Sequence, residues 1–99
     1  HFRNHGFLLT PRGWTLSPAY DMNPTLNEYQ SLLINSTTNH ADLQVLLDSS
    51  EEYMIGKDEA VRIIEEVKAR VKHWKSKATR LGIAKREMDL FEQVYERAL

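Results

Sequence analysis

The pattern of apolar and polar positions divides the chain into a first part typical of strands and loops and a second part typical of helices. Residues 7–10 (FLLT) and 14–16 (WTL) flank the short connection Pro11–Gly13, which predicts a hairpin with a left-handed residue at Gly13. Prolines and asparagines then keep the chain extended or turning. We therefore predict a hairpin and loop region over residues 1–38.

From residue 39 onward the apolar positions recur at helical spacing. A first helix is predicted over about residues 41–54, with Gly56 as its stop. A second helix carries an apolar stripe that continues until Gly82 ends it, and a third helix follows Ile83. The stripe consists of Ala60, Ile63, Ile64, Val67, Val71, Trp74 and Ala78. The predicted fold is mainly α, with a short N-terminal β-hairpin followed by a three-helix bundle over residues 39–99.

The length and charge of the chain exclude several classes of protein. A chain of 99 residues has room for one domain with a modest core. Its 13 basic and 14 acidic residues nearly balance, which argues against a protein that binds nucleic acids or membranes nonspecifically over its whole surface. The chain has no cysteine, which excludes disulfide and thiol chemistry and fits a cytoplasmic protein. No apolar run approaches membrane-spanning length, so we expect no membrane partner.

Two candidate metal ligands, Asn4 and Asp21, bracket the predicted hairpin. Protein kinases place an Asn at the end of the catalytic loop and an Asp just beyond a short hairpin, where both bind the magnesium ions that bridge the ATP phosphates. Magnesium takes hard oxygen ligands and keeps several waters, so one Asn, one Asp and the phosphates suffice. Taken singly, each residue is more typical of an ordinary turn than of a metal ligand. Their joint pattern favours the magnesium site.

The residues around these two positions resemble the HipA-like serine/threonine kinases, which are toxins of bacterial toxin–antitoxin pairs. The family carries a D-x-H-x-x-N loop, and His1–Asn4 (HFRN) is similar to its second half. The family's magnesium-binding Asp stands in a segment similar to Leu16–Asp21 (LSPAYD), with a Pro soon after, as at Pro24 here. Residues 59–83 are similar to the family's C-terminal helices, so the resemblance spans nearly the whole chain.

The resemblance implies the helical part of a kinase-like C-lobe. In that lobe Asn4 and Asp21 would bind Mg²⁺, and His1, Arg3 and Tyr20 would border the ATP. The parent protein would transfer the γ-phosphoryl group of ATP to a Ser or Thr hydroxyl of a protein substrate. The catalytic Asp of the family would stand two residues before His1. We therefore expect the N-terminal lobe and the catalytic Asp to lie outside this chain, and residues 1–99 alone to be inactive and prone to self-association through uncovered apolar surface.

The segment 68–80 contains six lysines and arginines and no acidic residue. In the resembled family a HipB-like antitoxin holds the kinase on operator DNA, which implies an antitoxin partner and DNA contacts by Lys68, Arg70 and Lys72. The residues themselves favour a solvated helix face whose charge complements the helix dipole. For the chain as a whole, the alternative to a kinase fragment is a noncatalytic helical module that binds an antitoxin or DNA through this basic helix.

Overall fold

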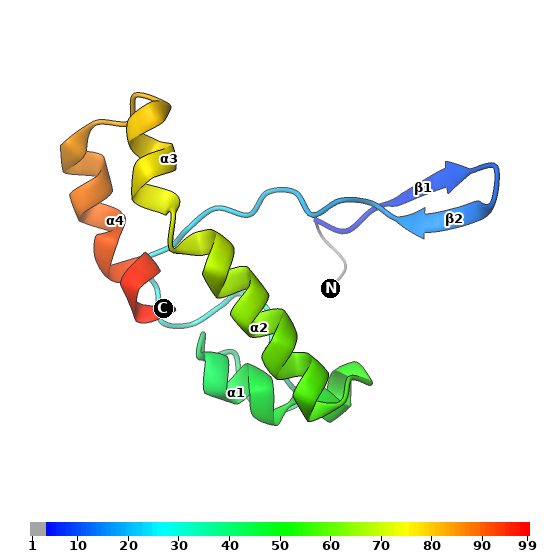
Figure 1. Cartoon of the computed structure of the whole chain (residues 1–99). Coiled ribbons are helices and arrows are strands. Elements are labelled where there is room, and N and C mark those ends of the chain that lie inside the picture. The colour runs from blue at the N-terminus through cyan, green and yellow to red at the C-terminus, as the bar shows by residue number, and fades with distance from the viewer. Residues whose placement is uncertain (1–3) are drawn as a thin grey trace.

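A computed structural model of the chain describes residues 4–99 and shows a hairpin that precedes a set of helices (Figure 1). The elements in chain order are β1 (Phe7–Thr10), β2 (Gly13–Leu16), α1 (Leu43–Asp48), the 3₁₀ helix η1 (Ser50–Tyr53), α2 (Lys57–Val71), α3 (Trp74–Arg80) and α4 (Lys85–Arg97). The predicted mainly α fold with an N-terminal hairpin is confirmed. No helix within residues 4–99 is long and apolar enough to cross a membrane.

The hairpin is antiparallel and projects away from the helices (Figure 1). Phe7 pairs with Leu16 and Leu9 pairs with Trp14, so these four side chains share one face. All four are exposed, and Trp14 most of all at 71%. Gly13 has a φ of +113°, which confirms the predicted positive φ at the tip of the hairpin. The hairpin therefore presents an apolar face that no other described element covers.

The first predicted helix, over residues 41–54, is shorter than expected. Ser49 donates a side-chain hydrogen bond of 2.6 Å to the carbonyl one turn earlier and accepts one of 2.8 Å from Asn35 Nδ2. These bonds hold Ser49 in a buried turn, after which the chain continues as η1 instead of α-helix. The left-handed residue that ends η1 is Met54, and Gly56 is the N-cap of α2. The prediction that Gly56 stops a helix was therefore wrong.

The second predicted helix divides into α2 and α3 at Lys72 and His73. The His73 amide bonds the carbonyl three residues earlier, at 3.4 Å, which tightens the backbone there, and α3 leaves at an angle to α2 (Figure 1). Beyond the break, the Trp74 ring stacks on Tyr95 of α4, with ring centroids 4.5 Å apart. Gly82, with a φ of +77°, follows the end of α3 as predicted.

The helices pack in two pairs, α1 with α2 and α3 with α4, and the interior is small. Ala60 is the one apolar residue that is buried among those the structure describes. The accessible surface is 8358 Å², whereas a compact monomer of 11.5 kDa has about 5800 Å². The radius of gyration is 15.8 Å, against about 13 Å for a compact domain of this length. The fold is therefore open, and much apolar surface is available for contact.

Candidate metal and nucleotide site

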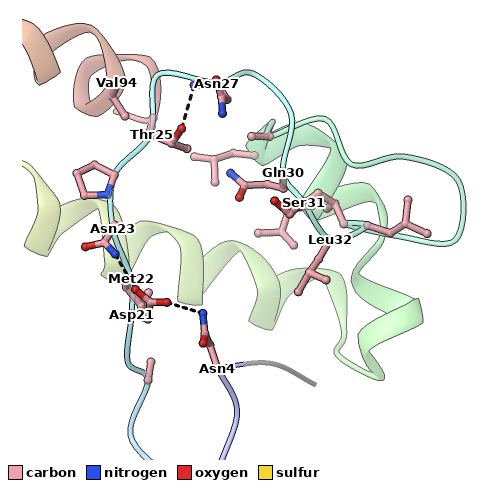
Figure 2. A pocket seen from close by; sticks show the side chains of 18 of the residues that line it. Asn4, Asp21, Met22, Asn23, Thr25, Asn27, Gln30, Ser31, Leu32 and Val94 are labelled. Carbon is pink, nitrogen blue, oxygen red and sulfur yellow. Dashed lines mark hydrogen bonds between the residues drawn. The ribbon is translucent and has the colours of Figure 1, made fainter. Parts of the chain in front are cut away.

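The two candidate metal ligands meet at the base of the hairpin. Asn4 precedes β1 and Asp21 follows β2, and the antiparallel pairing brings the outer ends of the two strands together. A hydrogen bond of 2.8 Å from the Ser17 amide to the Gly6 carbonyl continues the pairing toward the base. There Asn4 Nδ2 donates to Asp21 Oδ2 at 2.7 Å (Figure 2). The structure thus joins two residues that lie 17 positions apart.

Both residues have left-handed backbone conformations, with φ of 64° at Asn4 and 55° at Asp21. Side chains with a Cβ rarely adopt this region, and Asn and Asp are the residues that tolerate it best after Gly. Backbone conformations of this cost cluster at active sites and ligand clamps. The backbone is therefore unusual at both of the positions that the sequence pattern selects.

A third side chain, Asn23, completes the arrangement around the carboxylate. Asn23 Nδ2 donates to Asp21 Oδ1 at 2.7 Å, so each carboxylate oxygen of Asp21 accepts one amide hydrogen bond (Figure 2). A carboxylate has about four lone-pair sites, which leaves each oxygen with acceptor capacity toward a cation. The sequence analysis missed Asn23. The available signal was its position two residues after an Asp, a spacing at which short polar side chains commonly bond.

The oxygen atoms at this site suit a magnesium ion. Asp21 supplies a carboxylate and Asn4 supplies an amide oxygen, beside the nitrogen that bonds Asp21. Within residues 4–99, no group of three or more His, Cys, Asp or Glu side chains could hold a metal ion. The described residues therefore form no complete cage of such ligands. Magnesium does not need one, because it keeps several waters and commonly shares its ligands with substrate phosphates.

Of the residues that the resemblance places beside ATP, Tyr20 lies near the base of the hairpin and is about half exposed. A Cβ added to Gly6 would lie 3.8 Å from the Tyr20 ring and 3.3 Å from Ser17 Oγ, so Gly6 leaves room for both side chains. His1 and Arg3 lie outside the described residues. The structure therefore places one of these three residues, next to the pair formed by Asn4 and Asp21.

The pair lies at the edge of an open cleft of about 1310 Å³ (Figure 2). The loop over residues 16–34, the start of α1 and the end of α4 line this cleft, with Leu46 from α1 and Val94 and Arg97 from α4 among the lining residues. Small-molecule pockets typically enclose about 300–1000 Å³. The cleft is therefore larger than a typical small-molecule pocket and is open to solvent.

The three candidate DNA-contacting residues lie at the C-terminal end of α2 and just beyond it. Lys68 Nζ forms an ion pair of 3.3 Å with Glu65. Further along the same basic segment, Lys75 pairs with Glu92 and Glu96 of α4. Arg70 and Lys72 are exposed, and neither has an ion pair within the part of the chain that the structure describes. Part of the positive charge is therefore neutralised within the fold.

Comparison with known proteins identifies a family that the chain matches. A family model described as the HipA-like C-terminal domain matches residues 1–95, which include the hairpin, Asn4, Asp21 and Asn23, and nearly all of α4. Neither a curated protein nor a solved structure matches the chain.

Proposed function

The chain belongs to the HipA-like C-terminal domain family, and on that premise we propose that its parent protein is a serine/threonine kinase. The parent transfers the γ-phosphoryl group of ATP to a Ser or Thr hydroxyl of a protein substrate. Residues 1–99 contribute the metal-binding part of the site and the helices that support it. The kinase acts as the toxin of a toxin–antitoxin pair, with a HipB-like antitoxin as its partner.

The observation that carries this proposal is the hydrogen bond of 2.7 Å between Asn4 and Asp21 at the base of the hairpin. A magnesium ion that bridges ATP phosphates offsets the charge that develops during phosphoryl transfer. The Asp21 carboxylate supplies negative charge for that ion, and the Asn4 amide supplies a neutral oxygen. Tyr20, with His1 and Arg3, borders the nucleotide.

The proposal assigns catalysis to the parent protein and not to residues 1–99 alone. Phosphoryl transfer depends on holding both substrates and the metal in one geometry. The catalytic Asp of the resembled loop would orient the substrate hydroxyl, and it is not among these 99 residues. Residues 1–99 therefore contribute Asn4 and Asp21 to a geometry that also requires the catalytic Asp.

A second candidate function is a noncatalytic module that binds an antitoxin or operator DNA through the basic helix. Its support is the exposure of Arg70 and Lys72, because a few well-placed cations suffice for phosphate contacts. The ion pairs of Lys68 and Lys75 reduce the charge that this surface offers to DNA. We therefore rank this function below the kinase, and DNA contact by Lys68, Arg70 and Lys72 stays a prediction.

The test is an assay of ATP-dependent protein phosphorylation, including autophosphorylation, by the full-length parent. Asp21→Ala and Asn4→Ala, each confirmed to be folded, are compared with Asp58→Ala, which removes an exposed carboxylate from the first turn of α2. We expect roughly 100-fold or greater loss in the Asp21 variant and near wild-type activity in the Asp58 variant. A folded wild type that phosphorylates neither itself nor any candidate substrate would contradict the proposal. Binding to antitoxin and DNA would then be measured.

A further inference from the structure

We infer that Asn23 is a positioning residue that fixes the orientation of the Asp21 carboxylate for metal binding; this inference rests on the proposed function. Asn23 Nδ2 lies 2.7 Å from Asp21 Oδ1, on the side of the carboxylate opposite to Asn4. Neither the family match nor the resemblance that selected Asn4 and Asp21 assigns a role to Asn23.

Within residues 4–99, little besides hydrogen bonding restrains the Asp21 side chain. Asp21 is exposed and lies in an irregular loop between β2 and α1, where packing does not fix a side-chain rotamer. Two amide hydrogen bonds are the side-chain contacts that hold its carboxylate within the described residues. Partners that hydrogen-bond to a metal ligand commonly set its orientation and affect metal affinity strongly.

Asn23 differs from Asn4 in a way that suits positioning. Asn4 belongs to the segment before β1 and is itself a proposed ligand, so its amide has to serve the metal as well as Asp21. Asn23 lies in the same loop as Asp21, and its bond to Oδ1 joins residues only two positions apart. Its amide is neutral, so it orients the carboxylate without offsetting the negative charge that attracts the cation.

The inference is tested by metal binding to the full-length parent in the presence of a nonhydrolysable ATP analogue. Mn²⁺ serves as a paramagnetic substitute for Mg²⁺, and electron paramagnetic resonance measures the free ion. The variants are Asn23→Ala, Asn23→Ser, which retains a short hydrogen-bond donor, and Asp21→Ala. The matched control is Gln93→Ala, because Gln93 also carries a side-chain amide but is exposed on α4 and is not among the residues that line the cleft.

We expect Asn23→Ala to weaken Mn²⁺ binding roughly 10-fold, as is usual when a ligand loses its outer hydrogen-bond partner. Asn23→Ser should recover part of the affinity, and Gln93→Ala should match the wild type. Affinity for the nucleotide without metal should stay the same in all three variants. A change in Asn23→Ala no larger than that in the control would overturn the inference and leave the proposed function intact.

Two further outcomes also decide the question. If Asn23→Ala does not fold, Asn23→Ser takes its place in the binding measurement. Weakened metal binding by the folded Ser variant would then support a positioning role. Wild-type binding by that variant, or failure of both variants to fold, would assign Asn23 a structural role instead. If Asp21→Ala binds Mn²⁺ as well as the wild type does, the proposed metal site itself fails, and the role of Asn23 fails with it. The two failures are therefore distinguishable.

Discussion

Asn4 and Asp21 join the two ends of the β1–β2 hairpin through a hydrogen bond of 2.7 Å, and both residues have a positive φ. Side chain and backbone thus make separate demands on the residue at each position. Under the proposed function the side chain carries an oxygen ligand for the metal, while the backbone must tolerate the left-handed region. Asn and Asp satisfy both demands, whereas Glu and Gln offer similar oxygen atoms but tolerate this backbone less well.

These two demands can be separated at Asp21. Asp21→Gly and Asp21→Ala both remove the carboxylate, so under the proposed function both should lower phosphorylation by the full-length protein roughly 100-fold or more. Gly accepts the φ of 55° without steric cost, whereas Ala does not. We expect the Gly variant to be more stable than the Ala variant by about 1 kcal/mol, measured by urea unfolding. Equal stability of the two variants would show that the positive φ costs little at this position.

The stacked pair of Trp74 and Tyr95 predicts where the helical part is most sensitive to substitution. Trp74 is partly buried between α3 and α4, so Trp74→Ala should destabilise residues 1–99 by about 2 kcal/mol, less than for a fully buried Trp. Trp14→Ala is the matched control, because Trp14 is 71% exposed on the hairpin. It should change the free energy of unfolding by less than about 0.5 kcal/mol. Similar losses in the two variants would contradict the packing described for α3 and α4.

The ion pair between Lys75 and Glu92 predicts a dependence of stability on pH. The hydrogen bond from Lys75 lowers the pKa of Glu92 below its ordinary value of 4.5. The stabilisation that the ionised Glu92 gives to the folded state is therefore fully present above about pH 4.5. It is lost as the pH falls through the lowered pKa of Glu92 in the folded state. The same bond raises the pKa of Lys75 above 10.5. The stabilisation from the charged Lys75 is therefore lost only as the pH rises through this raised pKa.

Thermal unfolding of residues 1–99 from neutral to acid pH measures this effect. Glu92→Gln should lower the melting temperature at neutral pH, and the difference from wild type should shrink in acid. Glu87→Gln, at an exposed position on the same helix, is the control and should show a smaller difference throughout. The effect should be small and should weaken with added salt, because the pair is solvent-exposed. If the difference in melting temperature between Glu92→Gln and wild type grew in acid, it would contradict this prediction.

The open fold predicts self-association of residues 1–99. The accessible surface exceeds that of a compact monomer by roughly 2500 Å², an area comparable to that buried in a large protein–protein interface. Sedimentation should show dimers or larger species as the concentration rises, and Leu9→Lys with Trp14→Lys on the exposed hairpin face should reduce them. A strictly monomeric chain at high concentration would contradict this prediction.

Much of the secondary structure could be predicted from the sequence, because it follows from local patterns. The hairpin followed from two short apolar runs around Gly13, and the end of α3 followed from Gly82. The division at Lys72 and His73 could not be predicted in this way. That segment contains neither Pro nor Gly, and the stacking that accompanies the break joins Trp74 to a residue on another helix. Contacts of this kind depend on the tertiary arrangement.

The candidate site likewise has one part that could be predicted from the sequence and another part that could not. The meeting of Asn4 and Asp21 could be anticipated, because a hairpin brings its own two ends together. The bond from Asn23 is local, but Asn is common in loops and its spacing alone does not distinguish a positioning role from an ordinary turn. The early end of α1 depends on a bond from Asn35 to Ser49, 14 residues away, and no local pattern indicates that contact.

The antiparallel register of the hairpin determines which insertions the site can tolerate. Two residues added at the tip, one to each strand, would lengthen the hairpin and leave the ends at Asn4 and Asp21 facing each other. A single residue added within one strand would instead shift the pairing and turn its side chains to the opposite face. Related chains could therefore keep the two proposed ligands together while differing in the number of residues between them. A search pattern with a fixed gap would miss them, whereas one that allows paired increments at the tip would find them.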